Sequence, residues 1–310
     1  MRIAVFGSGG VGGYFGGKLA HAGEEVVFIA RGKHLKAMLQ DGLKVESIKG
    51  DFIVKPVQAY DNPSEVGQVA VVLVCIKAWQ VEEATRSMRP LVGPDTIVVP
   101  LLNGVEAPGQ LVAVLGNQHV LGGLCHIMSY LAGPGHIVHA GIEPHVAFGE
   151  LDGRPSQRAE DLRSAFDRAG VWAEVPEDIQ AAMWQKFLFI ASISGVGAVT
   201  RVPVGVIRRL PEPRQMLYQA MEEIALVAKA YDIDLPADVV EKTMNFVDNL
   251  PEGVTASMQR DIIEKRPSEL GSQNGAIVRL ATKRRIATPV NNFLYASLLP
   301  QEMQARGLEI

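Results

Sequence analysis

Residues 1–31 read MRIAVFGSGGVGGYFGGKLAHAGEEVVFIAR, and this stretch decides the fold. The apolar run over 2–6 ends at a glycine and predicts a buried parallel strand. Apolar residues recur at helical spacing over 11–22, and a second short strand is predicted over 25–30. The order strand, glycine turn, helix, strand is one βαβ unit.

The turn of this unit has the pattern G-x-G-x-x-G. Gly7 permits a tight turn, Gly9 lets a pyrophosphate approach the backbone, and Gly12 lets the helix pack on the strand. An anion would then lie on free N–H groups at the helix N-terminus. Because the pattern follows a strand and opens a helix, it favours a dinucleotide site over a turn without a ligand. The expected cofactor-binding residues are Gly7, Ser8, Gly9, Gly10, Val11 and Gly12.

The second strand ends in Arg31, where NAD enzymes commonly have an acidic residue that binds the ribose hydroxyls. An arginine instead pairs with the 2′-phosphate of NADP through its planar donors. Lys33 or His34 could add a second contact. The alternative is a surface arginine without a ligand, and we favour NADP(H) as the cofactor.

Alternating strand and helix patterns continue to about Pro176. Repeated βα units imply an α/β fold with a Rossmann-type, doubly wound parallel sheet. After Pro176 only helical patterns remain. We therefore expect an NADP-binding Rossmann domain over 1–176 and an all-helical substrate and catalytic domain over 177–310. The predicted strands that follow the first βαβ unit are 69–76, 96–102, one from 120 onward, 146–148 and 171–175, and the predicted helices between them are 81–88 and 156–169.

The composition is that of an ordinary globular chain, with 47% hydrophobic and 21% charged residues and a net charge of −4. It argues against disorder, and the lack of a basic block argues against a nucleic acid partner. No uninterrupted apolar run reaches the roughly 18 residues of a membrane span. Cys75 and Cys125 lie in apolar stretches, as buried thiols of a reducing compartment do. We therefore expect a cytoplasmic protein without a membrane partner.

Five of the seven histidines fall between 119 and 145. Their spacing matches no zinc pattern, and no cysteine pair accompanies them. We expect them at strand edges and turns of the sheet, and we expect no metal site.

Polar residues that could do chemistry follow two of the predicted strands and interrupt one apolar helix. Lys77 and Asn103 come directly after strands, at the edge where ligands bind open α/β sheets, although Lys77 could equally be a solvated loop residue. Lys186 is a lone charge in an apolar stretch, and such a cation needs a partner or a function. It either snorkels from a buried helix face or acts as an acid toward a carbonyl oxygen. Ser257 and Glu269 are candidate partners.

The chain resembles the ketopantoate reductase family of NADPH-dependent 2-oxo-acid reductases over nearly its whole length. The resemblance rests on the order and spacing of several short motifs, each of which is modest alone. The motifs are Gly7–Gly12, Arg31, Val74-Cys75-Ile76-Lys77, Leu102-Asn103-Gly104, Trp184-Gln185-Lys186, Ser257-Met258, Glu269, Asn274-Gly275, and Thr288-Pro289 with Asn291.

The resemblance implies a Rossmann domain followed by a helical domain, with the substrate in the cleft between them. It implies that Lys186 is the general acid that protonates the ketone oxygen, and that Glu269 orients this lysine or contacts the cofactor. Lys77 would bind the cofactor, Asn103 would contact both the nicotinamide side and the substrate, and Ser257 would bind the substrate carboxylate. A lysine suits this role because hydride addition builds negative charge on the oxygen. The implied reaction is the reduction of 2-dehydropantoate to pantoate in pantothenate biosynthesis.

One part of the pattern departs from the family. Members usually have asparagines four and eight residues after the lysine, where this chain has Ile190 and Ser194. Isoleucine cannot hydrogen-bond and serine is short, although Ser194 stays a candidate substrate contact. Either other residues recognise the substrate hydroxyl, or the substrate lacks it. Arg201 and Arg208 are candidates for replacing lost carboxylate contacts, or are surface residues.

Two alternatives to 2-dehydropantoate reduction stay open. One is the same chemistry on a different 2-oxo acid. The other is an NADPH-binding sensor or scaffold without turnover, which the presence of Lys186, Ser257 and Glu269 together argues against. The apolar helices of the second half could form a homodimer face or simply a core.

Overall fold

The computed structural model describes residues 1–309, and their contacts divide the chain into two compact units. The first unit consists of Met1–Leu102 and Ala107–Ile179. The second consists of the short segment Asn103–Glu106 and the chain from Gln180 onward. Nothing in the sequence pattern predicts that this short segment groups with the helices.

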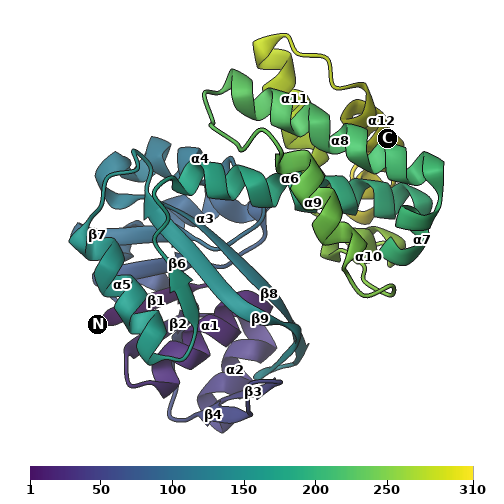
Figure 1. The fold of residues 1–310 in the computed structure, drawn as a ribbon. Helices are drawn as coiled ribbons and strands as arrows, with labels where there is room; N and C mark the ends of the chain where they lie inside the picture. Colours follow the sequence, from purple (N-terminus) through teal and green to yellow (C-terminus); the bar gives the residue numbers. More distant parts are fainter. Residues whose placement is uncertain (310) are drawn as a thin grey trace. The chain divides into compact units, whose positions relative to one another are not determined.

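Five strands form a fully parallel sheet in the first unit (Figure 1). Their order, β5-β2-β1-β6-β7, corresponds to the order 3-2-1-4-5 of a Rossmann fold, so the expected sheet is confirmed. The strand order reverses between β1 and β6, and ligands of such sheets bind at the carboxyl ends of the strands there. The strands are β1 (Arg2–Phe6), β2 (Glu25–Ile29), β5 (Gln58–Tyr60), β6 (Val69–Val74) and β7 (Val92–Pro100).

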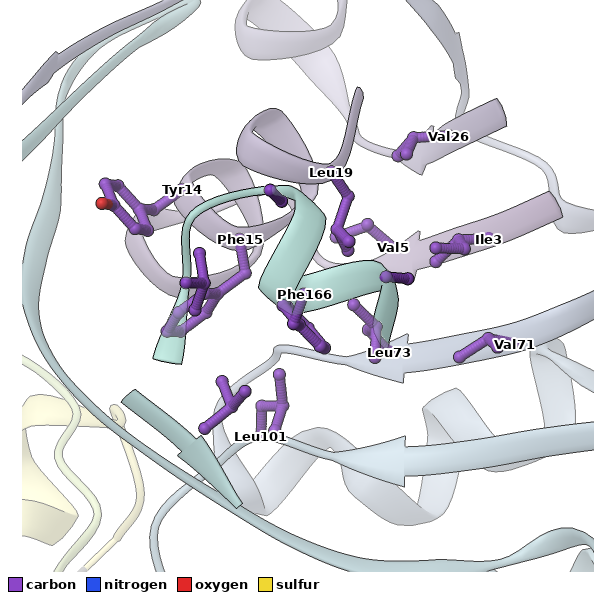
Figure 2. Close-up of a cluster of buried hydrophobic side chains, with 14 of the residues drawn as sticks. Ile3, Val5, Tyr14, Phe15, Leu19, Val26, Val71, Leu73, Leu101 and Phe166 are labelled. Atoms are coloured by element: carbon purple, nitrogen blue, oxygen red, sulfur yellow. The ribbon is translucent and has the colours of Figure 1, made fainter. Parts of the chain in front are cut away.

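Helices cover both faces of this sheet, because successive side chains of each strand point to opposite sides. Val5 packs on one face with Phe15 of α1 and Phe166 of α5 (Figure 2). Phe6 packs on the other face with Met88, which follows α3, and with Leu111 of α4. The sheet is therefore doubly wound. The helices of this unit are α1 (Gly10–His21), α2 (Gly32–Asp41), α3 (Val81–Ser87), α4 (Ala107–Leu115) and α5 (Gln157–Arg168), with the short 3-10 helices η1 (Pro63–Glu65), η2 (Ala78–Gln80), η3 (Arg89–Leu91) and η4 (Asn117–His119).

A second sheet, which the alternating pattern does not predict, packs against α1. Its centre is the antiparallel hairpin of β8 (Leu121–Gly133) and β9 (His136–Glu150). The short Pro134-Gly135 connection allows only an antiparallel return, since parallel strands need a long crossover. Strand β9 also pairs in parallel with β3 and β10, and β3 pairs with β4. These strands are β3 (Leu43–Ser47), β4 (Phe52–Val54) and β10 (Trp172–Glu174).

The second unit is helical, which confirms the expected all-helical domain. Between α10 and α11 the chain forms the 3-10 helix η5 (Leu270–Ser272). The helices are α6 (Ile179–Thr200), α7 (Val204–Arg209), α8 (Pro211–Ala230), α9 (Val239–Asp248), α10 (Ser257–Ile263), α11 (Asn274–Arg284) and α12 (Pro289–Ala305).

Helix α6 is the core helix of the second unit. Phe187 and Leu188 are buried and pack with Leu217 and Ile224 of α8. By length and hydropathy α6 could span a membrane, but 67% of its apolar window is buried inside the protein. A helix that is apolar all round is expected where the protein itself surrounds it.

Candidate active site

The glycine turn connects β1 to α1 and leaves the start of the helix uncapped by any side chain. Gly7 adopts φ +98°, a left-handed conformation that favours glycine. A side chain at Gly12 would overlap the Gly7 carbonyl oxygen and lie 2.9 Å from Cγ1 of Val5, so glycine lets α1 approach β1. At Gly9, by contrast, a side chain would meet nothing within 4 Å. The first turn of α1 thus offers N–H groups and room to an anion, which fits a pyrophosphate.

His34, in the first turn of α2, contacts this loop directly. Its Nε2 lies 2.8 Å from the Ser8 carbonyl oxygen, and its Nδ1 lies 2.9 Å from the Gly135 amide nitrogen. Burial lowers the pKa of His34. The imidazole is therefore engaged within the protein, and the suggestion that it adds a contact to a 2′-phosphate is wrong.

Arg31 lies between β2 and α2, at the carboxyl end of the strand that pairs with β1. Its backbone is extended and its side chain is exposed. The end of the second strand is where a Rossmann fold binds the ribose of a dinucleotide. The guanidinium is thus placed where a 2′-phosphate could reach it.

Lys77 follows β6 and begins the 3-10 helix η2. Its backbone N–H donates to Oε1 of Gln80 at 3.2 Å, and its Nζ lies 5.7 Å from the centre of the Trp79 ring. The glycine turn is next to this strand end, because a side chain at Gly7 would lie 2.6 Å from Cγ2 of Ile76. Lys77 and the glycine turn therefore share one edge of the sheet.

The segment Asn103–Glu106 brings together two predicted site residues that are far apart in the sequence. Nδ2 of Asn103 donates a hydrogen bond of 3.1 Å to Oε2 of Glu269, whose side chain is buried. At the other end of the segment Glu106 forms an ion pair of 2.6 Å with Arg279 of α11. The segment is thus anchored to the helical unit at both of its ends.

Lys186, Ile190 and Ser194 lie four residues apart on α6 and so share one face of the helix. Lys186 and Ile190 are half-buried. Ser194 is fully buried, and its hydroxyl makes no hydrogen bond to residues 1–309. The face therefore runs from a partly accessible lysine into the interior of the unit.

Gln273 is a residue that the sequence analysis missed. It is fully buried, and neither polar atom of its side chain has a hydrogen-bond partner in the described chain. Its backbone, at φ −105° and ψ −101°, lies outside the common regions. The next side chain, Asn274, donates to the Ala191 carbonyl oxygen of α6 at 3.3 Å and lies close to Gly195. Buried polar atoms without partners and unusual backbone angles gather at functional sites, and the adjacent amides were the available sequence signal.

Ser257 is the first residue of α10 and is half-buried. Two residues later, Nε2 of Gln259 donates to the Val202 carbonyl oxygen at 2.9 Å. A side chain at Gly197 would lie 2.6 Å from Oε1 of Gln259. Helix α10 therefore packs beside the C-terminal half of α6, the helix that holds Lys186.

The two downstream arginines differ in their surroundings. Nη1 of Arg208 donates to three backbone carbonyls over 247–250, the shortest bond being 2.6 Å. It satisfies carbonyls at the end of α9, which is a structural role rather than a substrate contact. Arg201 is exposed, and its Nη2 lies 3.3 Å from Oε1 of Gln301.

Asn291, one of the residues on which the family resemblance rests, belongs to a buried polar network that joins three helices. Its Oδ1 accepts from Nδ2 of Asn274 at 3.0 Å, and its Nδ2 donates to Oε2 of Glu223 at 2.8 Å. The same carboxylate accepts from the backbone N–H groups of Val290 and Asn291. Glu223 therefore caps α12, and these residues hold the helices together.

The histidines of the 119–145 stretch lie in the second sheet and in η4. His139 is buried, with Nδ1 2.8 Å from Oγ of Ser47. Residues 1–309 contain no group of three or more His, Cys, Asp or Glu side chains arranged to hold a metal ion.

A Rossmann sheet with a G-x-G-x-x-G turn between its first strand and first helix is typical of dinucleotide-binding proteins. Comparison with known proteins identifies the family within this class of proteins. The family model described as ketopantoate reductase PanE/ApbA matches residues 3–153, and the model of its C-terminal part matches residues 178–302. The chain belongs to the ketopantoate reductase family, and it is an oxidoreductase that acts on CH–OH groups.

Relatives and solved structures agree with this assignment. The chain is 30% identical to the uncharacterized oxidoreductase YkpB of Bacillus subtilis, over 98% of this chain and 100% of that protein. It is 29% identical to a 2-dehydropantoate 2-reductase of Nostoc sp., over 96% of this chain and 94% of that protein. A PanE/ApbA family ketopantoate reductase from Ralstonia eutropha superposes with a TM-score of 0.90 at 31% identity, over 99% and 100%. D-mandelate dehydrogenase with NADH and anilino(oxo)acetate superposes with a TM-score of 0.88 at 25% identity, over 99% and 100%.

Proposed function

We propose that this oxidoreductase uses NADPH to reduce a 2-oxo acid to the 2-hydroxy acid, with 2-dehydropantoate as the substrate. In this proposal residues 1–176 bind the cofactor, and residues 177–310 carry the substrate and catalytic groups. The hydrogen bond between Asn103 and Glu269 carries the proposal. It joins two predicted site residues in the unit that also holds Lys186.

The first unit offers three groups to the cofactor. The N–H groups of the glycine turn would bind the pyrophosphate, because no side chain caps α1 and Gly9 leaves room. Arg31 would pair with the 2′-phosphate, which is the reason for proposing NADPH rather than NADH. Lys77, at the same sheet edge, would contact a further polar group of the cofactor. When bound, NADPH supplies the hydride that adds to C2 of the oxo acid.

The catalytic steps belong to residues of the second unit. Lys186 donates a proton to the ketone oxygen as negative charge develops there. Glu269 holds one N–H of the Asn103 side-chain amide and so fixes the orientation of that amide. The Oδ1 atom and the second N–H of Asn103 then serve the nicotinamide side and the substrate. The hydroxyl of Ser257 binds the substrate carboxylate.

Substrate choice depends on what lies around Ile190 and Ser194. The side-chain amide of Gln273 has no hydrogen-bond partner in residues 1–309, and the next residue, Asn274, contacts Ala191 of α6. This amide is a candidate group for a substrate hydroxyl, which favours 2-dehydropantoate. The apolar side chain of Ile190 and the burial of Ser194 favour a second candidate, a 2-oxo acid without that hydroxyl. Loss of a paired hydroxyl typically changes binding by about 1–3 kcal/mol, so rates should separate the two.

A substrate panel tests the proposal. Purified protein would be assayed with NADPH and, in turn, 2-dehydropantoate, 3,3-dimethyl-2-oxobutanoate, which lacks only the hydroxyl, and the aryl 2-oxo acid benzoylformate. We expect the highest kcat/KM with 2-dehydropantoate. A higher kcat/KM with either of the other acids would show that 2-dehydropantoate is not the preferred substrate. If no 2-oxo acid supports NADPH oxidation, the proposed reductase activity is refuted.

The proposed surroundings follow from the same reaction. Neither cysteine forms a disulfide bond, which fits the reducing environment of the cytoplasm. Reduction of 2-dehydropantoate would place the enzyme in pantothenate biosynthesis, with a small molecule as its partner and neither nucleic acid nor membrane required. A homodimer through the apolar helices is proposed, and its test is the molar mass in solution.

A further inference from the structure

The two ring nitrogens of His34 have different partners, and the partners fix its tautomer. The Gly135 backbone N–H can only donate, so Nδ1 of His34 accepts this bond of 2.9 Å. The proton of the neutral ring is then on Nε2, which donates to the Ser8 carbonyl oxygen at 2.8 Å. Burial lowers the pKa of His34 and so favours this neutral ring.

The bond to Ser8 determines how the next peptide group points. In a trans peptide the C=O of one residue and the N–H of the next point in opposite directions. With the Ser8 oxygen held on the His34 side, the Gly9 N–H points to the opposite side. A Cβ at Gly9 would meet nothing within 4 Å, and glycine also tolerates the positive φ that a flipped peptide would give it. The loop therefore needs an outside contact to keep one orientation.

We propose that His34 is a positioning residue for cofactor binding: its Nε2–H holds the Ser8–Gly9 peptide so that an N–H, and not a carbonyl oxygen, faces the pyrophosphate. The inference rests on the proposed dinucleotide site. A flipped peptide would present the partial negative charge of a carbonyl oxygen to the phosphate and weaken binding. Arg31 begins the same helix, so the contact also ties the proposed 2′-phosphate residue to the loop.

Two substitutions separate the two bonds of His34. Glutamine places an amide nitrogen near the position of Nε2 and can still donate to the Ser8 oxygen. Asparagine places an amide oxygen near the position of Nδ1 and can still accept from Gly135. His34→Gln should therefore bind NADPH within about threefold of wild type, and His34→Asn about tenfold more weakly, which corresponds to 1.4 kcal/mol.

The measurement is the Kd for NADPH from fluorescence titration of the protein without substrate, with melting curves to show that each variant is folded. His119→Gln is the matched control, because His119 is also half-buried in the first unit but contacts the Thr96 carbonyl oxygen instead. A Kd for His34→Asn that equals or is lower than that of His34→Gln would overturn the inference. Wild-type protein that binds neither NADPH nor NADH would refute the dinucleotide site instead, and the two failures are distinguishable.

Nitrogen NMR of the His34 ring gives an independent readout without cofactor. We expect the neutral tautomer with the proton on Nε2 at neutral pH. A proton on Nδ1 would contradict the inference, because Nε2 could then no longer donate to Ser8.

Discussion

Replacing either of two glycines of the glycine turn by alanine should have opposite effects: one replacement should weaken cofactor binding and the other should lower stability. A Cβ at Gly9 would meet nothing within 4 Å, whereas a Cβ at Gly12 would overlap the Gly7 carbonyl oxygen and lie 2.9 Å from both Cβ of Cys75 and Cγ1 of Val5. Gly9→Ala should therefore fold normally and fail to bind the cofactor well. Gly12→Ala should destabilise the first unit.

The sizes of the two effects follow from these contacts. At Gly12 the neighbours are the Gly7 backbone, Val5 of β1 and Cys75 directly after β6, which cannot move aside, and overpacking of this kind costs about 1–3 kcal/mol. For a unit of this size each kcal/mol lowers Tm by about 2–4 °C. At Gly9, alanine is a poorer N-cap residue than glycine, which lowers the free energy of unfolding. Alanine also reduces the entropy of the unfolded chain, which raises that free energy by a similar amount, so the two effects about cancel. Its methyl group would instead occupy the space of the pyrophosphate and raise the Kd by about tenfold or more.

The assay pairs a melting curve without cofactor with an NADPH titration for each variant. Gly9→Ala should keep its Tm within about 2 °C and lose affinity, and Gly12→Ala should melt about 2–12 °C lower. An unchanged Kd in Gly9→Ala would refute the assignment of the loop as the cofactor site. An unchanged Tm in Gly12→Ala would refute the packing argument.

Four further predictions address other residues. Lys186→Ala should lower turnover at least a hundredfold with NADPH binding intact, and a variant that keeps more than about a tenth of wild-type turnover would contradict its role as the acid. Arg31→Glu should shift the ratio of the Kd values toward NADH, and an unchanged ratio would make Arg31 a bystander. Arg158 donates two hydrogen bonds of 2.6 Å to Glu150 and lowers the pKa of that carboxyl. Glu150→Gln should therefore lower the free energy of unfolding by up to about 1 kcal/mol above pH 4.5. Denaturant titrations should show this difference fading as the pH falls and the wild-type carboxyl becomes protonated. Gln273→Met should raise Tm, because it removes a buried amide without partners that costs about 1–3 kcal/mol, and a lower Tm would show that the amide is satisfied in solution.

The elements with strong periodicity could be predicted from the sequence. The strand over 2–6 and the strand over 69–76 are short apolar runs ended by turn residues, and both lie at the centre of the parallel sheet. The helices after Pro176 were predicted because no strand pattern competes with their spacing. In the second sheet, β3 and β4 were missed because they have five and three residues, too few to show a period. The strands predicted from 120 onward, over 146–148 and over 171–175 exist, but they belong to this second sheet and not to the parallel one.

The candidate site could be predicted from the sequence at positions where the local backbone geometry or chemistry requires one particular residue type. The glycine turn is such a case, since its backbone geometry demands the residues that the sequence shows. The contact between Asn103 and Glu269 was not predictable from spacing, because 166 positions separate them. His34 and Gln273 were misread or missed because their roles depend on which backbone groups surround them in three dimensions.

The grouping of Asn103–Glu106 with the helices limits how this enzyme can be dissected genetically. A gene cut at Ile179 would yield a helical fragment that lacks Asn103 and a Rossmann fragment in which Val105 has lost the apolar side chains that it packs against. Glu269 would lose its amide donor in the first fragment, and mixing the two fragments would restore the contact only if they reassociate. The contact between Asn103 and Glu269 is therefore best studied in the uncut chain, where both residues are present in one molecule.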